Sequence, residues 1–473
     1  MSKAQSLLAA AVAAFAAGFA ALAVMQQRAF ETGRFDVGNV TQAVWSTAHG
    51  DFLEMTGLTG RQISRLGAHF DPLLAAFAPL WWVWPDPSLL LVSQAVAVAL
   101  GAIPVFRLAR RHLGSERAAL GLALVYLLYP ATQWLVVDDV HPVALATPLL
   151  LFAWDFLDRD QIRNFAVAAA LACLTKEHVG LTVAMLGLWY AVAHDRRRTG
   201  AVIALLGTAT AILATAVIVP HFHPGDSAPF ADRYANVGGT PTGILETALT
   251  DPVSLVGEAT SGRDLGYLLD LLVPLAGLPL LAPLAAATAL PELAANLLSS
   301  SRTQTSIHFH YTATAIPGLI VGSIFGAARL ARWLGPRNRY VPQGLVVVTL
   351  LGGVAYGPLP LWRHVPLGEH VGARDHLLSR RDAAARRAVA LVPSGAPVSA
   401  TNLLGAHLSA RRRVFSFPVL REARWLVVDS KRLSYLDQAV APIRGARALR
   451  RIRSDPRWRV VFAEQGILVL RRD

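Results

Sequence analysis

A lone acid follows the first long apolar run of the sequence. The run ends at Gln27, and Asp36 lies in the stretch GRFDVGNVTQAVWSTAHGDF, which begins at Gly33 and leads into an amphipathic helix pattern. A carboxylate at this position can act as a general base or bind a metal ion. An aspartate that precedes a helix also commonly caps its first turn. The residues alone leave both roles open.

Two adjacent acids and a histidine end a later apolar run. The stretch WLVVDDVHP places Asp138, Asp139 and His141 directly before Pro142. Paired carboxylates with a nearby histidine suit a hard divalent cation or acid–base chemistry. A polar hairpin, capped by an aspartate before a proline at the first helical position, is the competing interpretation.

The stretch TKEHVG has the sharpest local signal. Lys176, Glu177 and His178 lie between two apolar runs with little room for a loop. Ionisable residues at such a depth are costly and usually face a cavity or a partner. Lys176 is expected to bind a phosphate as a point charge, with Glu177 holding the lysine or binding a metal ion. A plain Lys–Glu pair at the membrane interface is the alternative.

Two other polar connections hold further candidates. The stretch RQISRLGAHFDP (61–72) and the stretch PELAANLLSSSRTQTSIHFHY (291–311) contribute Arg65, His69, Glu292, Arg302, His308 and His310. An H-x-H pair projects both rings to one side of an extended segment. One such pair is too few ligands for a full metal site, so binding of a phosphate or diphosphate is an equal expectation.

Signature motifs of several enzyme classes do not occur in the sequence. It contains no P-loop, no G-x-G-x-x-G after a strand, no H-E-x-x-H and no G-x-S-x-G. Nucleotide-dependent enzymes, zincins and α/β-hydrolases therefore lack support.

Composition predicts the elements that must position these residues. Of 473 residues, 54% are hydrophobic and only 16% are charged, against about 25% charged in soluble domains. A polytopic α-helical membrane protein is the expected class. The single cysteine, Cys173, excludes an internal disulfide and a thiolate metal cluster.

The apolar runs and the arginines between them predict topology. About eleven membrane helices are expected, at 4–27, 88–110, 117–136, 141–157, 162–178, 179–194, 200–220, 265–278, 279–298, 312–332 and 341–360. The first run exceeds the signal-peptide core of about 7–15 residues, so it is predicted to stay as an anchor. Arginine clusters at 107–117, 159–163, 196–198 and 329–339 then fall on one side, the cytoplasm, which makes the N-terminus cytoplasmic. The Trp-rich run 71–85 is too short to span and is expected at the outer interface.

The remaining connections collect outside the bacterial cell (inner) membrane. They are the first outer loop at 28–87 and further outer loops at 221–264 and 299–311. Residues 361–473 carry 22 Lys or Arg against 9 Asp or Glu, whereas residues 1–360 carry equal numbers of basic and acidic residues. Short β-rich runs at 414–418, 425–429 and 460–471 predict a small basic α/β domain outside the membrane. Its charge suits anionic headgroups or an anionic polymer rather than nucleic acid.

Several stretches together resemble a known family. They include FDVGNVTQAVWSTAHGDF, DDVHPVALATPLLL, LTKEHVGLTV, LPELAANLLSS and HFHYTATAIP, with VSATNLLGAHLSARRRVFSFP in the tail. The sequence is similar to a domain-of-unknown-function family of polytopic prokaryotic membrane proteins that is grouped with the GT-C glycosyltransferases. The likeness covers nearly the whole chain.

That resemblance implies an inverting transfer of a sugar from a polyprenyl-phosphate donor to a cell-envelope glycan or lipid acceptor. Asp36 matches the catalytic acid of the first outer loop, and Asp138 with Asp139 matches a second acidic site. Lys176, with Arg65, Arg302, His308 and His310, would bind the donor phosphate, supported by Glu177, His178, His141, His69 and Glu292. No D-x-D lies near Asp36, so a requirement for Mg²⁺ or Mn²⁺ at Asp138, Asp139 and Glu177 stays open.

Two other functions remain compatible with these residues. Charges gathered at the outer face would also suit a transporter or flippase of lipid-linked sugars. Transporters usually carry inverted repeats or ionisable groups near the bilayer midplane, and the sequence has neither in a convincing form. An envelope assembly factor with a polymer-binding tail is the third interpretation.

Overall fold

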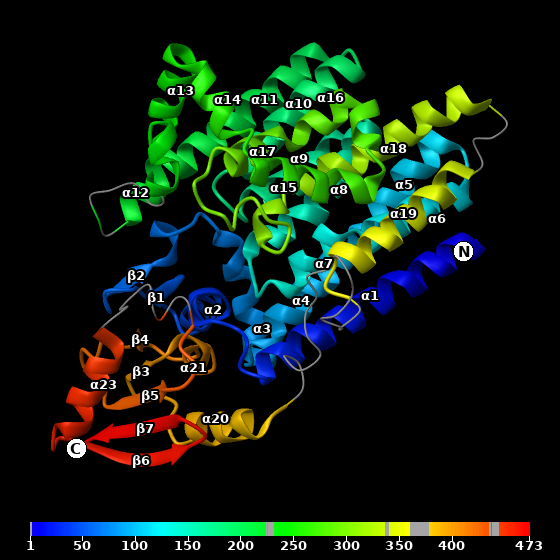
Figure 1. Ribbon diagram of the computed structural model, residues 1–473. Coiled ribbons are helices and arrows are strands. Elements are labelled where there is room, and N and C mark those ends of the chain that lie inside the picture. Colours follow the sequence, from blue (N-terminus) through cyan, green and yellow to red (C-terminus); the bar gives the residue numbers. More distant parts are fainter. Residues whose placement is uncertain are drawn as a thin grey trace.

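The computed structural model describes residues 2–223, 225, 231–335, 340–359, 378–434, 437 and 444–473. A helical bundle forms one end of the molecule, and a mixed β-sheet with its helices forms the other (Figure 1). The long helix α1 begins at the N-terminus, far from the sheet, and the chain ends in the sheet.

The first three-quarters of the chain are mainly helical. Its helices are α1 (Lys3–Arg28), α2 (Asn39–Ala48), α3 (Ala78–Val83), α4 (Ser88–Leu100), α5 (Ala102–Leu113), α6 (Glu116–Leu128), α7 (Pro130–Val137), α8 (Ala146–Asp158), α9 (Ile162–Cys173), α10 (Val179–Ala193), α11 (Arg197–Ile212), α12 (Val219–Phe222), α13 (Pro241–Thr250), α14 (Pro252–Glu258), α15 (Gly262–Leu272), α16 (Pro283–Ala286), α17 (Leu290–Leu297), α18 (Ala315–Leu334) and α19 (Val341–Tyr356). A short hairpin, β1 (Glu54–Thr56) with β2 (Gln62–Ser64), follows α2.

Membrane length is reached by a subset of these helices. Within the described residues, four helical segments are long and apolar enough to span: Lys3–Arg28, Ser88–Leu113, Arg197–Phe222 and Ala315–Leu334. A fifth arises if α6 and α7, bent by 45° before Pro130, form one span, since proline lacks the amide that would continue the helix. The predicted count of about eleven stays a prediction. The run at 71–85 folds into a 3₁₀ turn and the short helix α3.

Glycines allow the backbones of helices α10 and α11 to touch each other. A Cβ atom added to Gly180 would overlap the carbonyl oxygen of Gly207, and one on Gly200 would lie 2.5 Å from the carbonyl oxygen of Gly187. Small residues of this kind let helices approach closely where lipid removes the hydrophobic driving force.

Ion pairs join several basic connections at one end of the bundle. The fully buried Asp155 of α8 accepts from Arg111 of α5 at 2.7 Å and from Arg159 at 2.7 Å. Arg196 lies 4.0 Å from Asp160. Three of the four arginine clusters predicted to share one side therefore lie together. Residues 336–339, which include part of the fourth, lie outside the described residues.

The C-terminal segment forms a five-stranded sheet. Its elements are α20 (Arg380–Ala390), β3 (Val398–Ala400), α21 (Asn402–Ala406), β4 (Val414–Ser416), β5 (Trp425–Asp429), α23 (Arg444–Ser454), β6 (Trp458–Glu464) and β7 (Ile467–Arg472). The strand order is β4-β3-β5-β7-β6, with β3 parallel to both neighbours and the other pairs antiparallel. The run predicted at 460–471 is a hairpin that turns at Gln465 and Gly466, both at positive φ. Strand β3 carries no strong local signal and was not predicted.

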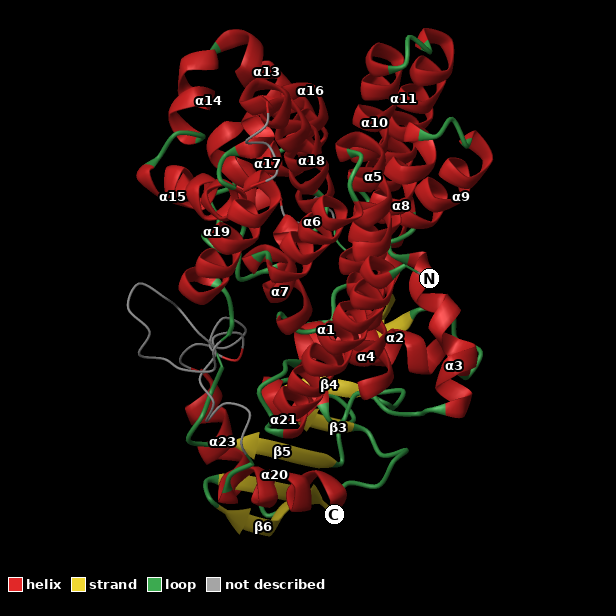
Figure 2. Cartoon of the chain, turned by 90° about the vertical axis from the view of Figure 1, so that its right-hand side faces the viewer, coloured by secondary structure: helices red, strands yellow, loops and turns green. Residues whose placement is uncertain are grey.

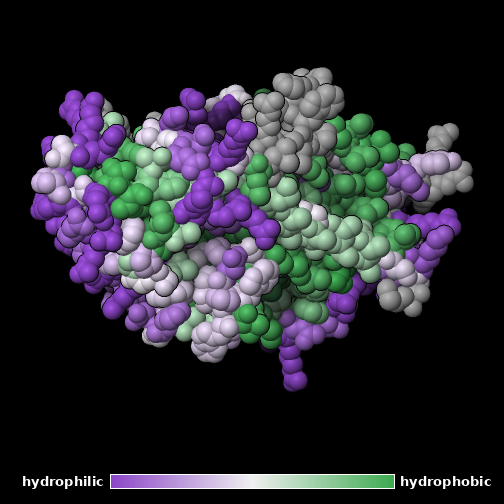
Figure 3. Space-filling model, turned by 90° about the horizontal axis from the view of Figure 1, so that it is seen from below, coloured by the Kyte–Doolittle hydropathy of each residue, from purple (hydrophilic) through white to green (hydrophobic). Residues whose placement is uncertain are grey.

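The sheet lies directly against the first polar loop. Figure 2 shows the sheet below the helical bundle, with α21 on the side of the sheet that faces the bundle. Phe30, just after α1, packs in the same apolar core as Val398, Val414 and Val427 of the sheet. The lower face is hydrophilic over the C-terminal end and apolar over the opposite end (Figure 3). The predicted domain boundary at 360/361 lies outside the described residues, so the two-domain division stays a prediction.

Candidate functional site

Asp36 lies in a π-helical turn, Arg34–Gly38, between α1 and α2. Helix α2 begins after Gly38, and no side chain makes a capping hydrogen bond there. The expectation that Asp36 caps this helix is therefore wrong. Among the described residues, no hydrogen-bond donor contacts the Asp36 carboxylate. A π-turn places an extra residue in the helical path, a feature frequent at functional sites.

The C-terminal sheet holds this turn from one side. The buried guanidinium of Arg34 donates to Ser416 Oγ at 2.6 Å and to the carbonyl oxygens of Thr56 at 2.6 Å and Val414 at 2.8 Å. The side-chain oxygen of Asn402 accepts the Phe35 amide at 3.2 Å. Neutral partners thus fix the two residues that precede Asp36 in the turn and leave the Asp36 carboxylate free.

Asp139 holds the turn from the other side. Its Oδ2 accepts the backbone amide of Gly33 at 3.1 Å. Burial raises the pKa of Asp139 well above its ordinary value, and the charges of Asp36 and Asp138 raise it further. Burial likewise raises the pKa of Asp36 against the charge of His141. Two neighbouring carboxylates in a desolvated place resist double ionisation, which makes Asp36 a stronger base than a free aspartate.

Asp138 joins two histidines into a compact cluster. Its Oδ2 accepts the His310 backbone amide at 2.8 Å and lies 3.2 Å from His310 Nδ1 and 3.4 Å from His141 Nε2. The two imidazole rings stack with centroids 3.6 Å apart. Burial raises the pKa of Asp138, but the charge of His141 and hydrogen bonds from both histidines outweigh it, so the pKa falls below its usual range. Asp138 is thus an anion here.

Neither acid of the DDVHP turn acts as a local cap. The 3₁₀ turn that starts at Pro142 has no side-chain capping bond. Gln94 of α4 shapes the turn instead: its amide donates to the Asp139 carbonyl at 2.7 Å and accepts the His141 amide at 3.0 Å. The competing interpretation of a capped hairpin is therefore wrong.

Donor atoms of Asp138, His141 and His310 lie within 4.8 Å of one another, so these residues could hold a metal ion. Two imidazoles and one carboxylate suit zinc or a similar transition metal better than Mg²⁺. Burial lowers the pKa of His310 well below its ordinary value, which keeps its ring in the neutral form that a ligand requires. Asp139 and Glu177, the other expected ligands, make different contacts.

The TKEHVG stretch supplies a lysine with no charged partner. Lys176 Nζ lies 5.7 Å from the centre of the Tyr311 ring, and within the part of the chain that the structure describes it makes no ion pair or hydrogen bond. Glu177 pairs instead with His69, at 3.3 Å, and accepts the Phe70 amide at 3.0 Å. Lys176 therefore makes no direct ion pair with Glu177 and acts on it only through its charge, so its ammonium group is available to a ligand.

Tyr311 brings a second cation to the same place. Arg233 lies with Cζ 5.8 Å from the Tyr311 ring centre and donates to the Tyr311 hydroxyl at 3.2 Å. His310 precedes this tyrosine and packs against its ring with centroids 4.2 Å apart. His310 belongs to the cluster with Asp138 and His141, and the next residue, Tyr311, contacts both Lys176 and Arg233. The cluster therefore lies next to the two cations.

Other predicted residues support the site or lie apart from it. His178 Nε2 lies 2.8 Å from Glu292 Oε2, and Thr314 also donates to Glu292. Arg65 is buried and paired with Asp71 at 2.6 Å. Arg302 is exposed, and none of the described cluster residues contacts it. The His308 ring packs at a tilt against Trp134, with centroids 4.6 Å apart, and is not a member of the Asp138–His141–His310 cluster.

Sequence reasoning did not identify Arg34, Gln94, Arg233, Tyr311 or Asn402. Gln94 interrupts an apolar run and Arg233 is an isolated arginine in a predicted outer loop, so both offered a signal. Arg34 and Asn402 offered none, because Arg34 and Ser416 are 382 residues apart and Phe35 and Asn402 are 367 apart.

Comparisons with known proteins identify the architecture. A family model described as "Predicted membrane protein (DUF2079)" matches residues 27–469. The crystal structure of ArnT from Cupriavidus metallidurans bound to undecaprenyl phosphate is similar, with a TM-score of 0.53, 14% identity, and coverage of 98% of this chain and 97% of that one. Its apo form gives a TM-score of 0.49 at 13% identity, with coverage of 92% and 93%. No curated protein sequence matches the chain. The predicted GT-C-like membrane fold is confirmed.

Proposed function

The chain belongs to the DUF2079 family of predicted membrane proteins, and we propose that it is a glycosyltransferase that uses a polyprenyl-phosphate sugar. One observation carries the proposal: Asp36, whose carboxylate has no hydrogen-bond donor among the described residues, and Lys176, which makes no ion pair with them, belong to one half-buried charged cluster at a connection of the bundle. The likeness to ArnT, crystallised with undecaprenyl phosphate, supports the choice of donor.

Electrostatic contacts support a single site. The charges of His141, Asp138, Arg65 and His69 act on the Asp36 carboxyl. The Lys176 charge acts in turn on His69 and on His310. The base and the cation therefore share His69 as a neighbour, and His310, on which Lys176 acts, contacts Asp138, which acts on Asp36.

The proposed step is a displacement at the anomeric carbon. Asp36 accepts the proton of the acceptor hydroxyl while the hydroxyl oxygen bonds to the anomeric carbon. The bond between that carbon and the oxygen of the donor phosphate breaks at the same time. The electron pair leaves with the polyprenyl phosphate, whose growing negative charge Lys176 stabilises, assisted by Arg233 beside Tyr311. Attack opposite the leaving group inverts the anomeric centre.

Asp138, His141 and His310 are proposed to hold a divalent cation. When bound, such a cation would add positive charge for the leaving phosphate. The chain's own groups orient this set: Gln94 fixes the turn that carries His141, and the His310 amide fixes Asp138.

The direct test is turnover in liposomes supplied with polyprenyl-phosphate sugars and candidate glycan or lipid acceptors. Asp36→Asn should lower kcat by about 10²–10⁴-fold, the usual contribution of a general base. Lys176→Gln should lower it by about 10²–10³-fold, as expected for loss of transition-state charge stabilisation.

Arg163→Gln, an exposed change on α9, is the matched control and should leave turnover unchanged. Turnover that survives Asp36→Asn would remove this residue from catalysis. Movement of labelled lipid across the bilayer without sugar transfer would show a flippase instead.

A further inference from the structure

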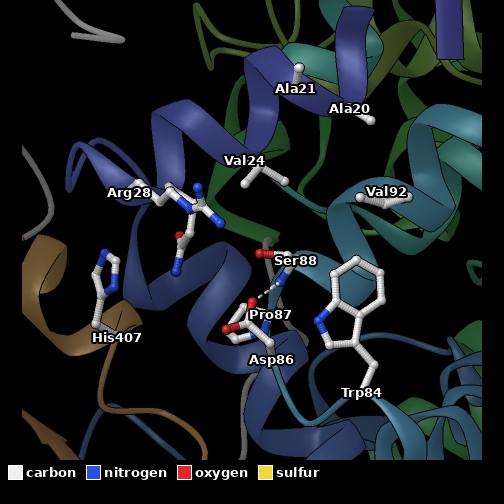
Figure 4. A pocket seen from close by; sticks show the side chains of 11 residues that line it. Ala20, Ala21, Val24, Arg28, Trp84, Asp86, Pro87, Ser88, Val92 and His407 are labelled. Atoms are coloured by element: carbon white, nitrogen blue, oxygen red, sulfur yellow. Dashed lines mark hydrogen bonds between the residues drawn. The ribbon is translucent and has the colours of Figure 1, made fainter. Parts of the chain in front are cut away.

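A cavity lies beside the end of α1, away from Asp36. It has a volume of about 480 Å³ and lies between the last turns of α1, the connection before α4, and His407 after α21. Figure 4 shows Arg28 and His407 on one side of it and Trp84 on the other, with Asp86 and Ser88 between them. Its lining is separate from the residues around Asp36, so it is not part of the proposed catalytic site.

The cavity is amphipathic along α1. Ala20, Ala21 and Val24, with Val92 of α4, form an apolar part. Gln27 and Arg28, one to two turns further along α1, form a polar part. The distance along α1 from Ala20 to Arg28 is about 12 Å at the normal helical rise. Such a gradient fits a molecule with an apolar chain and a polar head.

The polar part contains two opposite charges that do not pair with each other. Arg28 makes no ion pair or hydrogen bond with any described residue. One oxygen of Asp86 accepts the Ser88 amide at 2.7 Å, and the carboxylate makes no ion pair with the described residues. Burial lowers the pKa of His407 to about 4, so its ring is neutral and Arg28 is the one cation of the lining. A ligand with both an anionic and a cationic group satisfies both side chains.

Gln27 adds a hydrogen-bond donor. The residue is 5% exposed, and its side-chain oxygen accepts the Thr32 hydroxyl. Its amide NH₂ group has no partner among the described residues, and Gln27 lines the cavity. An anionic oxygen between Arg28 and Gln27 would receive donors from both.

The surroundings suit a membrane surface. Trp82 and Val83 of α3, which directly precede Trp84, are 69% and 86% exposed. Tryptophan is enriched where a protein meets the headgroup level of a bilayer. Helix α1 is of membrane length and ends beside the cavity at Arg28.

We propose that this cavity binds one aminophospholipid molecule, its phosphate on Arg28 and Gln27, its primary ammonium on Asp86, and the start of its acyl chain against Ala20, Val24 and Val92. The volume lies within the range of about 300–1,000 Å³ for small-molecule sites. An ammonium makes a charge-assisted hydrogen bond to the free oxygen of Asp86, whereas a headgroup whose only charge is its phosphate can offer that oxygen only a neutral hydroxyl. The site is independent of sugar transfer.

The test measures phospholipid that stays bound to the purified full-length protein. The protein is delipidated, incubated with vesicles of phosphatidylethanolamine or phosphatidylglycerol, repurified and analysed by native mass spectrometry. The native protein should retain phosphatidylethanolamine about tenfold better, since one charge-assisted hydrogen bond is worth about 1.4 kcal/mol or more. Asp86→Asn should abolish that preference, and Arg28→Gln should weaken retention of both lipids.

Other variants separate the alternatives. Ala21→Trp, on an exposed face of α1, should block both lipids by filling the apolar part, while Arg163→Gln should change nothing. Asp36→Asn should leave retention unchanged, so this proposal and the proposed reaction fail independently. Soluble phosphoethanolamine should not displace the lipid at equal concentration, and displacement would show a site for the free ester instead. Equal retention of both lipids by the native protein, or retention unaffected by Arg28→Gln, would overturn the proposal.

Discussion

At the scale of residues, the site is defined by which charges have partners and which do not. Arg65, Glu177 and Asp138 are fully engaged by neighbours. Asp36 and Lys176 are not, although both lie in a desolvated cluster. An uncompensated group in such a place costs folding free energy unless a ligand completes it. Of the residues expected from the sequence to act directly, Asp36 and Lys176 are thus two whose charged groups make no ion pair or hydrogen bond with the described residues.

The raised pKa of Asp139 predicts how activity depends on pH. Burial and the charge of Asp36 raise that pKa well above its ordinary value, so Asp139 still carries its proton at the pH where Asp36 ionises. Asp139→Asn imitates this neutral acid and keeps an oxygen for the Gly33 amide, so the pKa of Asp36 should change little. Because Asp36 must be ionised to act as a base, activity is lost as pH falls through its pKa, and the acid limb of kcat/KM against pH should stay in place in this variant, as in the Asp51→Asn control in the turn after α2. A limb that moves to lower pH in Asp139→Asn alone would show that Asp139 is charged when Asp36 titrates.

The cluster of Asp138, His141 and His310 predicts bound metal. Purified protein should carry about one divalent cation per chain, because two imidazoles and a carboxylate are a usual ligand set with one open position. His310→Ala should release it, and elemental analysis measures the change. His308→Ala is the matched control, since that ring packs at a tilt against Trp134. Equal metal content in native protein and the His310→Ala variant would rule out the site.

At the scale of elements, the π-helical turn that carries Asp36 is held between structures from distant parts of the chain. Arg34 contacts β4, Phe35 contacts the start of α21, and Gly33 contacts the turn after α7. Gly38 also lies against Ser409, where a Cβ atom would come within 2.7 Å of the hydroxyl. The C-terminal sheet therefore acts on Asp36 through the backbone.

Removing one of these contacts should affect catalysis more than binding. Asn402→Ala deletes the acceptor for the Phe35 amide, so Asp36 should lose its orientation. We expect kcat to fall about tenfold or more with little change in KM for the donor, and stability to fall by about 1 kcal/mol. Asn164→Ala, an exposed change on α9, controls for the substitution itself. An equal loss of stability with unchanged kcat would show that Asn402 is structural only.

At the scale of the whole molecule, contacts between the sheet and the first loop hold the tail beside the turn that carries Asp36. Glu31 pairs with Arg432, and Arg34 donates to Ser416. The tail must therefore lie on the same side as the C-terminal end of α1, which leads to Asp36. The three joined arginine connections near Asp155 lie together at one end of the bundle.

This arrangement predicts the topology. If α1 spans, the N-terminus and the tail lie on opposite sides, and the positive-inside rule places the N-terminus in the cytoplasm. A reporter fused after Asp473 should therefore read as outside the cell membrane, and one placed before Met1 as cytoplasmic. Two reporters on the same side would contradict both the predicted odd number of spans and the outer position of the site.

The sequence by itself determined the apolar runs, the acids at their ends and the fold class. Hydropathy and local motifs act over a few residues, so they are readable without coordinates. Only the tertiary structure decided which polar groups meet. Asp138 and His310 are 172 residues apart, and Gly33 and Asp139 are 106 apart. Such pairs form because α1, α4, α7 and the C-terminal sheet pack together, and no local pattern encodes that packing. Asp36 was visible as an acid in the sequence, but its lack of a partner was not.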